Sequence, residues 1–343
     1  MQKRNLNSRV KILLNYVVGP LLFIVLGYII YSKIKAQPDI PDQIKLLKDT
    51  LSGKNIWQYI LLMLLLLFAN WGIEARKWQL LMRPVQRVSF LTSVKAILSG
   101  LALSLFLPNG FGEYPARALY MKEGNRLRSV ALNVAGSMAQ LIITLVAGIV
   151  SLLYLKHFAW SKTVEIQGLS VLWLNGIISM IILGTLLLII IYFRLSWLTQ
   201  ITGKIPFVHR YKFFIESLET FHWKELTRIL MLSCIRFIVF VVQYMLVLYV
   251  LEIKIDVIDA ICTTCVLFLF LAILPTIPFA DVSIRGIAGR QLFGLLTPNS
   301  FGIVVTIAVI WFVNLILPSA VGSLFLLSVK IFKRADKSNK RIT

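Results

Sequence analysis

The sequence predicts an all-α, polytopic membrane protein, and three observations lead to that prediction. Of its 343 residues, 58% are hydrophobic and 15% are charged, against about 45–50% and 25% in an average soluble domain. Several apolar runs reach the roughly 20 residues that a helix needs to cross the hydrocarbon core. The 36 Lys and Arg residues against 15 Asp and Glu residues give a net charge of +21. In so apolar a chain this charge belongs to loops and tails, where it sets membrane orientation, and we expect no nucleic-acid partner.

Six apolar runs are long enough to be complete membrane spans. The first follows four basic residues. It has about 20 residues and no small-residue cleavage site, so we expect an anchored span rather than a signal peptide. The predicted spans cover residues 12–31, 56–73, 129–155, 170–193, 229–251 and 301–329. All lie in a single integral membrane domain, residues 1–343, which ends in a basic cytoplasmic tail at 331–343.

Two further apolar stretches, residues 89–107 and 257–274, run into segments that break a helix. Proline removes a backbone donor and glycine frees the backbone, so the helices end there. Each stretch either forms a re-entrant hairpin that returns to its own side or crosses the membrane together with its return arm. An eight-span count is the alternative to six spans with two hairpins. The breaks hold Pro108, Gly110 and Gly112 in the first stretch, and Pro275 and Pro278 in the second.

The distribution of basic residues favours re-entrant hairpins. In that topology the cytoplasmic segments hold 24 Lys and Arg residues and the external segments hold 10, as the positive-inside rule requires. If residues 89–107 alone crossed the membrane, the four basic residues of segment 112–128 would become external. Every later loop would invert, including the basic 194–228 loop. We therefore expect six spans, two hairpins and two cytoplasmic termini, while the eight-span count stays open because it shares the same later orientation.

Two hairpins of opposite orientation make the chain an inverted repeat with halves 12–155 and 170–330. Each half carries, in order, an apolar arm, Leu-Pro, a short break, an acid and an arginine four residues after the acid. A shift of 167 residues places Ser89 on Asp256, at the starts of the two arms. Transporters built from inverted repeats bind substrate where their broken helices meet, so we expect the site at the breaks.

The acid and the arginine of each break are four residues apart, so Glu113 with Arg117 and Asp281 with Arg285 can pair on one helix face. An unpaired charge at the bilayer centre costs about 2.5–3.5 kcal/mol, so such charges should face a protein interior or a wet cavity. Two interpretations stay open. The pairs cap and hold the hairpin tips, or the arginines and the free amides around Asn109 receive an anionic headgroup such as a phosphate.

Arg236 lies about seven residues into its predicted span. It either snorkels to the cytoplasmic surface or lines a cavity as a third substrate-binding arginine. The apolar segments also contain six amide side chains that we expect mostly to join helices by hydrogen bonds. They are Asn70, Asn133, Gln140, Asn175, Gln243 and Asn314.

No motif for nucleotide hydrolysis, zinc-peptidase or serine-hydrolase chemistry occurs in the sequence. Cys262 and Cys265 have the CxxC spacing, but they lie in an apolar run and the three histidines lie elsewhere. We expect packing roles for these cysteines, no metal site, no cofactor and no enzymatic activity.

The run from Phe106 to Leu119, with Pro108, Gly112-Glu113 and Arg117, resembles a signature of the flippase-like membrane domain of lysylphosphatidylglycerol synthases. The segment Glu74 to Trp78 and the Leu-Pro break before Asp281 are similar to further features of that family. The resemblance covers about residues 12–330 and implies a lipid-handling protein of a bacterial cytoplasmic membrane. In the best-known relatives this domain moves an aminoacylated phospholipid between leaflets.

Because the chain ends soon after its last span, we expect a stand-alone member without the soluble synthase domain. The resemblance then implies a flippase or transporter for an anionic or zwitterionic amphiphile, with a membrane phospholipid or other lipid-linked molecule as its partner. Two other functions stay open. One is a transferase acting on a polyprenyl-phosphate-linked donor, with Asp39, Asp42 or Glu113 as base, and the other is a non-catalytic envelope scaffold.

Overall fold

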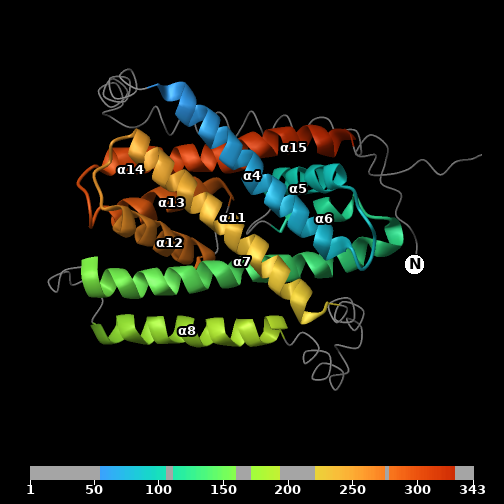
Figure 1. The fold of residues 1–343 in the computed structure, drawn as a ribbon, viewed down its shortest axis with the longest axis horizontal. Helices are drawn as coiled ribbons and strands as arrows, with labels where there is room; N and C mark the ends of the chain where they lie inside the picture. Colours follow the sequence, from blue (N-terminus) through green and yellow to red (C-terminus); the bar gives the residue numbers. More distant parts are fainter. Residues whose placement is uncertain (1–54, 106–110, 160–170, 194–220, 275–277, 329–343) are drawn as a thin grey trace, which may run out of the picture.

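The computed structural model describes residues 55–105, 111–159, 171–193, 221–274 and 278–328, and every regular element in them is helical (Figure 1). Five helical segments in this part of the chain are long and apolar enough to cross a membrane, which confirms the polytopic all-α fold. They correspond to five of the six predicted spans. The sixth, residues 12–31, lies outside the described residues, as does the tail at 331–343. The five segments are Ile56–Met82, Glu123–Ala159, Asn175–Phe193, Trp223–Val250 and Ser300–Leu326.

The helices follow the chain in a simple order. They are α4 (Ile56–Met82), α5 (Phe90–Ser104), α6 (Glu113–Ala118), α7 (Arg126–Tyr154), α8 (Val171–Phe193), α11 (Trp223–Val250), α12 (Val257–Ile273), α13 (Pro278–Phe293), α14 (Ser300–Trp311) and α15 (Leu317–Ser328). The π-helical turn η5 (Phe312–Ile316) joins α14 to α15.

Helix α4 is longer than predicted. The predicted cytoplasmic loop begins at residue 74, but the helix continues to Met82 and ends just before Pro84. Trp78, Leu81 and Met82 are buried, so the apolar stripe continues through this last part. A proline cannot continue the hydrogen-bond ladder, which explains why the helix stops there. The loop prediction was wrong for residues 74–82 because the charged side chains there were taken as solvent-exposed.

Two short helix pairs, α5 with α6 and α12 with α13, occupy opposite ends of the long helix α7 (Figure 1). Helix α5 packs on α15, whereas α13 packs on α14, so the pairs also use different parts of the last long helical segment. The helices α5 and α12 begin in the same way. Ser89 Oγ accepts a hydrogen bond from the Thr92 amide, and the Asp256 carboxylate accepts one from the Ile258 amide. The inverted repeat and the re-entrant course of each pair stay predictions.

The first break depends on Gly112. A Cβ atom at this position would lie 2.2 Å from the carbonyl oxygen of Leu103, because the start of α6 lies directly against the end of α5. Only a residue without a side chain allows this approach. Gly112 therefore acts as the predicted helix break, whereas Pro108, Gly110 and Pro275 lie outside the described residues. Pro278 is the first residue of α13, a position that proline favours.

Candidate functional site

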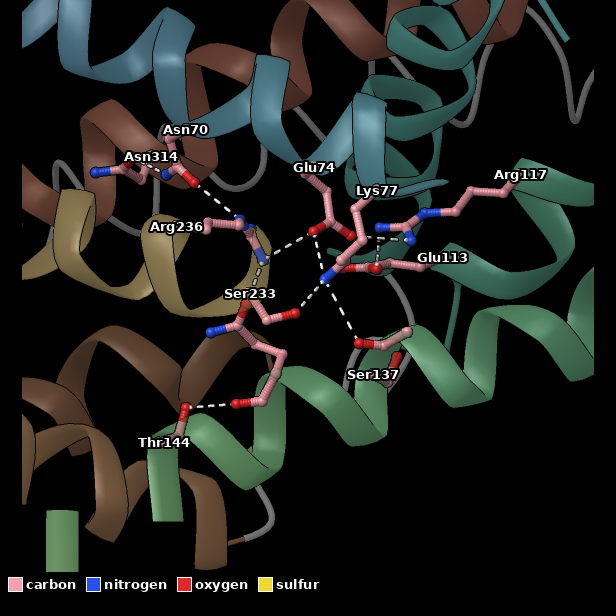
Figure 2. Close-up of polar contacts among 12 residues, drawn as sticks. Asn70, Glu74, Lys77, Glu113, Arg117, Ser137, Thr144, Ser233, Arg236 and Asn314 are labelled. Carbon is pink, nitrogen blue, oxygen red and sulfur yellow. Dashed lines mark hydrogen bonds and ion pairs between the residues drawn. The ribbon is translucent and has the colours of Figure 1, made fainter. Parts of the chain in front are cut away.

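Glu74 on α4 is at the centre of a buried charge cluster (Figure 2). Its carboxylate lies 2.7 Å from Lys77 Nζ, 3.3 Å from Arg236 Nη1 and 3.4 Å from Arg117 Nη1. The Glu74 side chain is only 6% exposed. A carboxylate at this depth stays ionised only when cations compensate it, and here the cations come from α4, α6 and α11.

Glu113 and Arg117 pair on α6, as their spacing predicts. The Glu113 side chain is 30% exposed and Arg117 is 7% exposed, so Glu113 is the accessible partner. Arg117 passes over Gly100 of α5, where a Cβ atom would lie 3.0 Å from Arg117 Cγ. The absence of a side chain at Gly100 thus leaves room for Arg117 to reach Glu74.

Lys77 connects α4 to two further helices. Its Nζ lies 3.4 Å from the Gly136 carbonyl oxygen on α7 and 3.4 Å from Ser233 Oγ on α11. The side chain is 3% exposed, and Glu74 is its partner on α4. An ammonium group carries three donors, and these three contacts can satisfy all of them.

Arg236 lies deeper than predicted and does not snorkel. Helix α11 begins at Trp223, so Arg236 is 13 residues into a helix of 28, about 20 Å at 1.5 Å per residue. Its Nε donates to Asn70 Oδ1 at 2.8 Å. Its guanidinium carbon lies 5.1 Å from the centre of the Trp71 ring and 5.2 Å from that of Phe240. These contacts direct the guanidinium toward α4 and the protein interior rather than to the surface, and its role as a cavity-lining, substrate-binding arginine stays a prediction.

An amide pair extends the cluster to the last helical segment. Asn70 Nδ2 donates to Asn314 Oδ1 at 2.9 Å across 244 residues of sequence, and Asn314 lies in the π-helical turn η5. Gln140 on α7 lies 3.5 Å from Arg236 Nη1 through its Oε1. The prediction that amides join the helices is therefore confirmed for Asn70, Gln140 and Asn314. It is wrong for Asn133 and Gln243, whose buried amide atoms have no hydrogen-bond partner among the described residues.

The cluster has more cations than acids and more donors than acceptors. Among the described side chains it contains three cations and two carboxylates, a formal surplus of one positive charge. Three buried donors, Arg117 Nε, Trp71 Nε1 and Trp78 Nε1, have no hydrogen-bond partner among the described residues. The acceptor Glu74 Oε2 has none either, but Lys77 and Arg236 approach it as ion pairs. Trp71, Glu74 and Trp78 share one face of α4 by their helical spacing. The surplus positive charge has the sign that an oxyanion would compensate.

Sequence reasoning missed Glu74 and Lys77 as site residues. Both lie beyond residue 73, the predicted end of the second span, although no proline occurs between the apolar run and Pro84. An acid and a lysine three residues apart at the end of an unbroken apolar run are the signal that would have revealed them.

The second predicted pair lies on another helix pair. Arg285 is half-buried on α13, which packs on α12 and α14, and Asp281 is in the same helix with a side chain outside the described part. Asn109 also lies outside the described residues. The structure thus brings together Glu113, Arg117 and Arg236 of the predicted substrate-binding residues, and their meeting with Asp281 and Arg285 stays a prediction.

A family model of the lysylphosphatidylglycerol synthase transmembrane region matches residues 17–322. The chain belongs to this family. Searches of curated proteins and of solved structures returned no match. The family assignment confirms the resemblance in the sequence and supports a lipid-related membrane function.

Proposed function

We propose that this protein moves a lipid with an anionic or zwitterionic headgroup between the two leaflets, and that the buried Glu74 cluster receives the headgroup. The observation that carries the proposal is the convergence of Lys77, Arg117 and Arg236 on one buried carboxylate. Membership of a family related to a phospholipid supports a lipid as the transported molecule. The proposal places the protein in a bacterial cytoplasmic membrane with both termini in the cytoplasm.

The buried charges of the cluster cost desolvation free energy. A buried ion-pair network is often no more stable than well-packed apolar side chains of the same volume, so stability alone does not explain this one. Ionisable groups inside membrane segments are functional candidates for this reason. Arg236 lies near the middle of a helix that is long enough to span the bilayer, which is where a headgroup in transit must be stabilised.

Exchange of carboxylate for phosphate gives a simple mechanism. Glu113 is the more exposed of the two acids and pairs with Arg117. A headgroup phosphate that displaces Glu113 would find a guanidinium with an unpartnered Nε and could bind it in the bidentate geometry that arginine favours. The phosphate would compensate Arg117 in place of Glu113, and the displaced Glu113 carboxylate, whose side chain is 30% exposed, would turn to the accessible side of the cluster. Glu74 meanwhile holds the three cations in position.

The proposal is tested by reconstitution into vesicles with fluorescent phosphatidylglycerol in the outer leaflet and a quencher that cannot cross the membrane. Arg117→Gln should slow translocation at least about tenfold, which corresponds to about 1.4 kcal/mol. Arg76→Gln is the matched control. Arg76 is an exposed arginine on the same helix as Glu74, and it contacts Gln79 of its own helix.

The outcomes separate the alternatives. Equal translocation by Arg117→Gln and the parent protein would contradict the role of the cluster. Arg117→Lys keeps the positive charge but loses the planar guanidinium with its parallel donors. If Arg117→Gln does not fold, Arg117→Lys tests the same position. A transferase would instead turn over a labelled polyprenyl-phosphate-linked donor, and a scaffold would show no translocation in any variant. Of the bases expected for a transferase, Asp39 and Asp42 lie outside the described residues.

A further inference from the structure

An apolar groove of about 440 Å³ lies between α7, α11 and α12. Its walls include Ile143 and Ala147 on α7, Val241 and Met245 on α11, and Cys265 on α12. Every residue that lines it has an aliphatic, aromatic, thioether or thiol side chain. A headgroup would find no partner for its polar atoms in this groove and would be disfavoured there.

The groove faces the hydrocarbon of the membrane. Its lining includes Val146, Ile238 and Val242, which are 41%, 54% and 42% exposed. These residues are in the middle of two helical segments that are long enough to cross a bilayer. Exposed apolar side chains at such positions contact lipid chains rather than water.

One end of the groove borders the charge cluster. Gln140, Ile143 and Ala147 follow the i, i+3, i+7 spacing, so they lie on one face of α7. The first contacts Arg236, and the other two line the groove. The Arg236 guanidinium lies 5.2 Å from the centre of the Phe240 ring, and both Phe240 and the lining residue Phe237 contact Phe268 of α12. The side chain of Arg236 is 14% exposed, more than those of Lys77, Glu74 and Arg117.

We propose that this groove holds one acyl chain of the transported lipid, whose headgroup meets the cluster at its Arg236 and Gln140 edge. The inference rests on the proposed function and adds two elements to it: a binding site for the tail and a lateral entrance between α7 and α11. A lipid bound in this way places its phosphate beside the least buried cation while its chain stays in apolar surroundings. Because lipid tails are as apolar as the groove, its selectivity comes from packing rather than from exclusion of water.

The test uses a phospholipid with a photoreactive diazirine in its acyl chain, incorporated into nanodiscs that contain the full chain. We expect adducts to concentrate on residues 143–147 and 234–245. They should exceed by about tenfold those on α8, where Met180 and Leu183 are 77% and 70% exposed and serve as an ordinary lipid-facing surface. Equal labelling of the groove and α8 would overturn the inference.

A second experiment uses variants whose larger side chains fill the groove. Ala147→Trp should reduce the groove adducts about fivefold and slow translocation, whereas the matched variant Leu183→Trp on the exposed face of α8 should change neither. Val241→Phe adds fewer atoms at the same site and keeps the test valid if the tryptophan variant does not fold. Undiminished groove adducts in both filled variants would contradict the tail site.

The two proposals fail in distinguishable ways. Selective labelling of the groove in a parent protein that translocates no lipid supports the tail site and contradicts the flippase function. Translocation with uniform labelling contradicts the tail site alone. Efficient disulfide formation through Cys234, a groove residue, between two copies of the chain in nanodiscs would show that a second copy covers the groove, and this result would overturn the inference.

Discussion

Glu74 contacts three cations in the interior of the helix bundle, and these cations have few alternative anionic partners. The other acid of the cluster, Glu113, pairs with Arg117 and is partly exposed, while the Glu74 side chain is 6% exposed. The two acids therefore have different roles in this account. Glu74 holds the cluster together, and Glu113 is the partner that a headgroup can replace.

Glu74→Gln should strongly destabilise the protein. The substitution leaves Lys77, Arg117 and Arg236 buried with one remaining carboxylate, and removal of one partner from a buried ion pair costs roughly 3–5 kcal/mol. Unfolding in a detergent series measures the loss. The double variant Glu74→Gln/Lys77→Met removes one charge of each sign and should recover a large part of it. A Glu74→Gln protein as stable as the parent would show that Glu74 does not hold the cations.

Glu113→Gln should strengthen lipid binding, whereas Arg117→Gln should weaken it. Loss of the accessible carboxylate frees the Arg117 guanidinium, so retained phosphatidylglycerol should increase about fivefold or more, because a charge-assisted contact to phosphate contributes about 1 kcal/mol or more. Native mass spectrometry of the purified protein counts the retained lipid. If Glu113→Gln loses lipid as Arg117→Gln is expected to do, the exchange mechanism is wrong.

At the scale of elements, the long segment from α14 to α15 connects the two short helix pairs. Helix α13 packs on α14 and α5 packs on α15, with the π-helical turn η5 between them. Asn314 in this turn contacts Asn70, which in turn contacts Arg236. π-Helical turns often occur at functional sites, and this one joins the charge cluster to the helix on which both pairs pack.

Asn314→Ala tests this connection. The variant loses the hydrogen bond to Asn70 and should destabilise the protein by about 0.6 kcal/mol, the average for interhelical hydrogen bonds in a membrane protein, and by at most about 1.7 kcal/mol. Ser323→Ala is the control, because Ser323 Oγ donates to Ala320 of its own helix. Thermal unfolding of both variants in the same detergent decides the comparison, and equal melting temperatures would contradict a connecting role for Asn314.

Gly112→Ala tests the contact between α5 and α6. The new Cβ atom would lie 2.2 Å from the Leu103 carbonyl oxygen, so one helix must move, at a cost of about 1–3 kcal/mol. Gly124→Ala is the matched control, since a Cβ atom there meets no other atom within 4 Å. Stability measurements on the two variants should differ clearly. An unaffected Gly112→Ala protein would show that the start of α6 is not packed against α5.

At the scale of the whole molecule, local sequence patterns predict the spans, the helix boundaries and the pairing of residues one turn apart, because these depend on neighbouring residues in the chain. The apolar runs predicted all five spans found among the described residues. Gly112 and Pro278, which were predicted to break helices, lie at the starts of α6 and α13. The spacing of Glu113 and Arg117 predicted their pairing, because four residues make about one helical turn.

Contacts between distant helices could not be predicted in this way. Arg117 meets Glu74 across 43 residues and Arg236 meets Asn70 across 166 residues, and no local pattern specifies which helices lie side by side. The depth of Arg236 was underestimated because helix α11 begins six residues before the predicted start at 229. Glu74 was missed because its compensation by Arg117 and Arg236 exists only in three dimensions.

The most direct test of the central claim is the fraction of labelled phosphatidylglycerol that crosses the bilayer of reconstituted vesicles. Vesicles with the parent protein should exchange the labelled lipid between leaflets. Vesicles with Arg117→Gln/Arg236→Gln should stay near the protein-free level, since the double variant removes two of the three cations that contact Glu74. Equal exchange by the parent protein and a folded double variant would contradict the claim that this cluster carries the headgroup across the membrane.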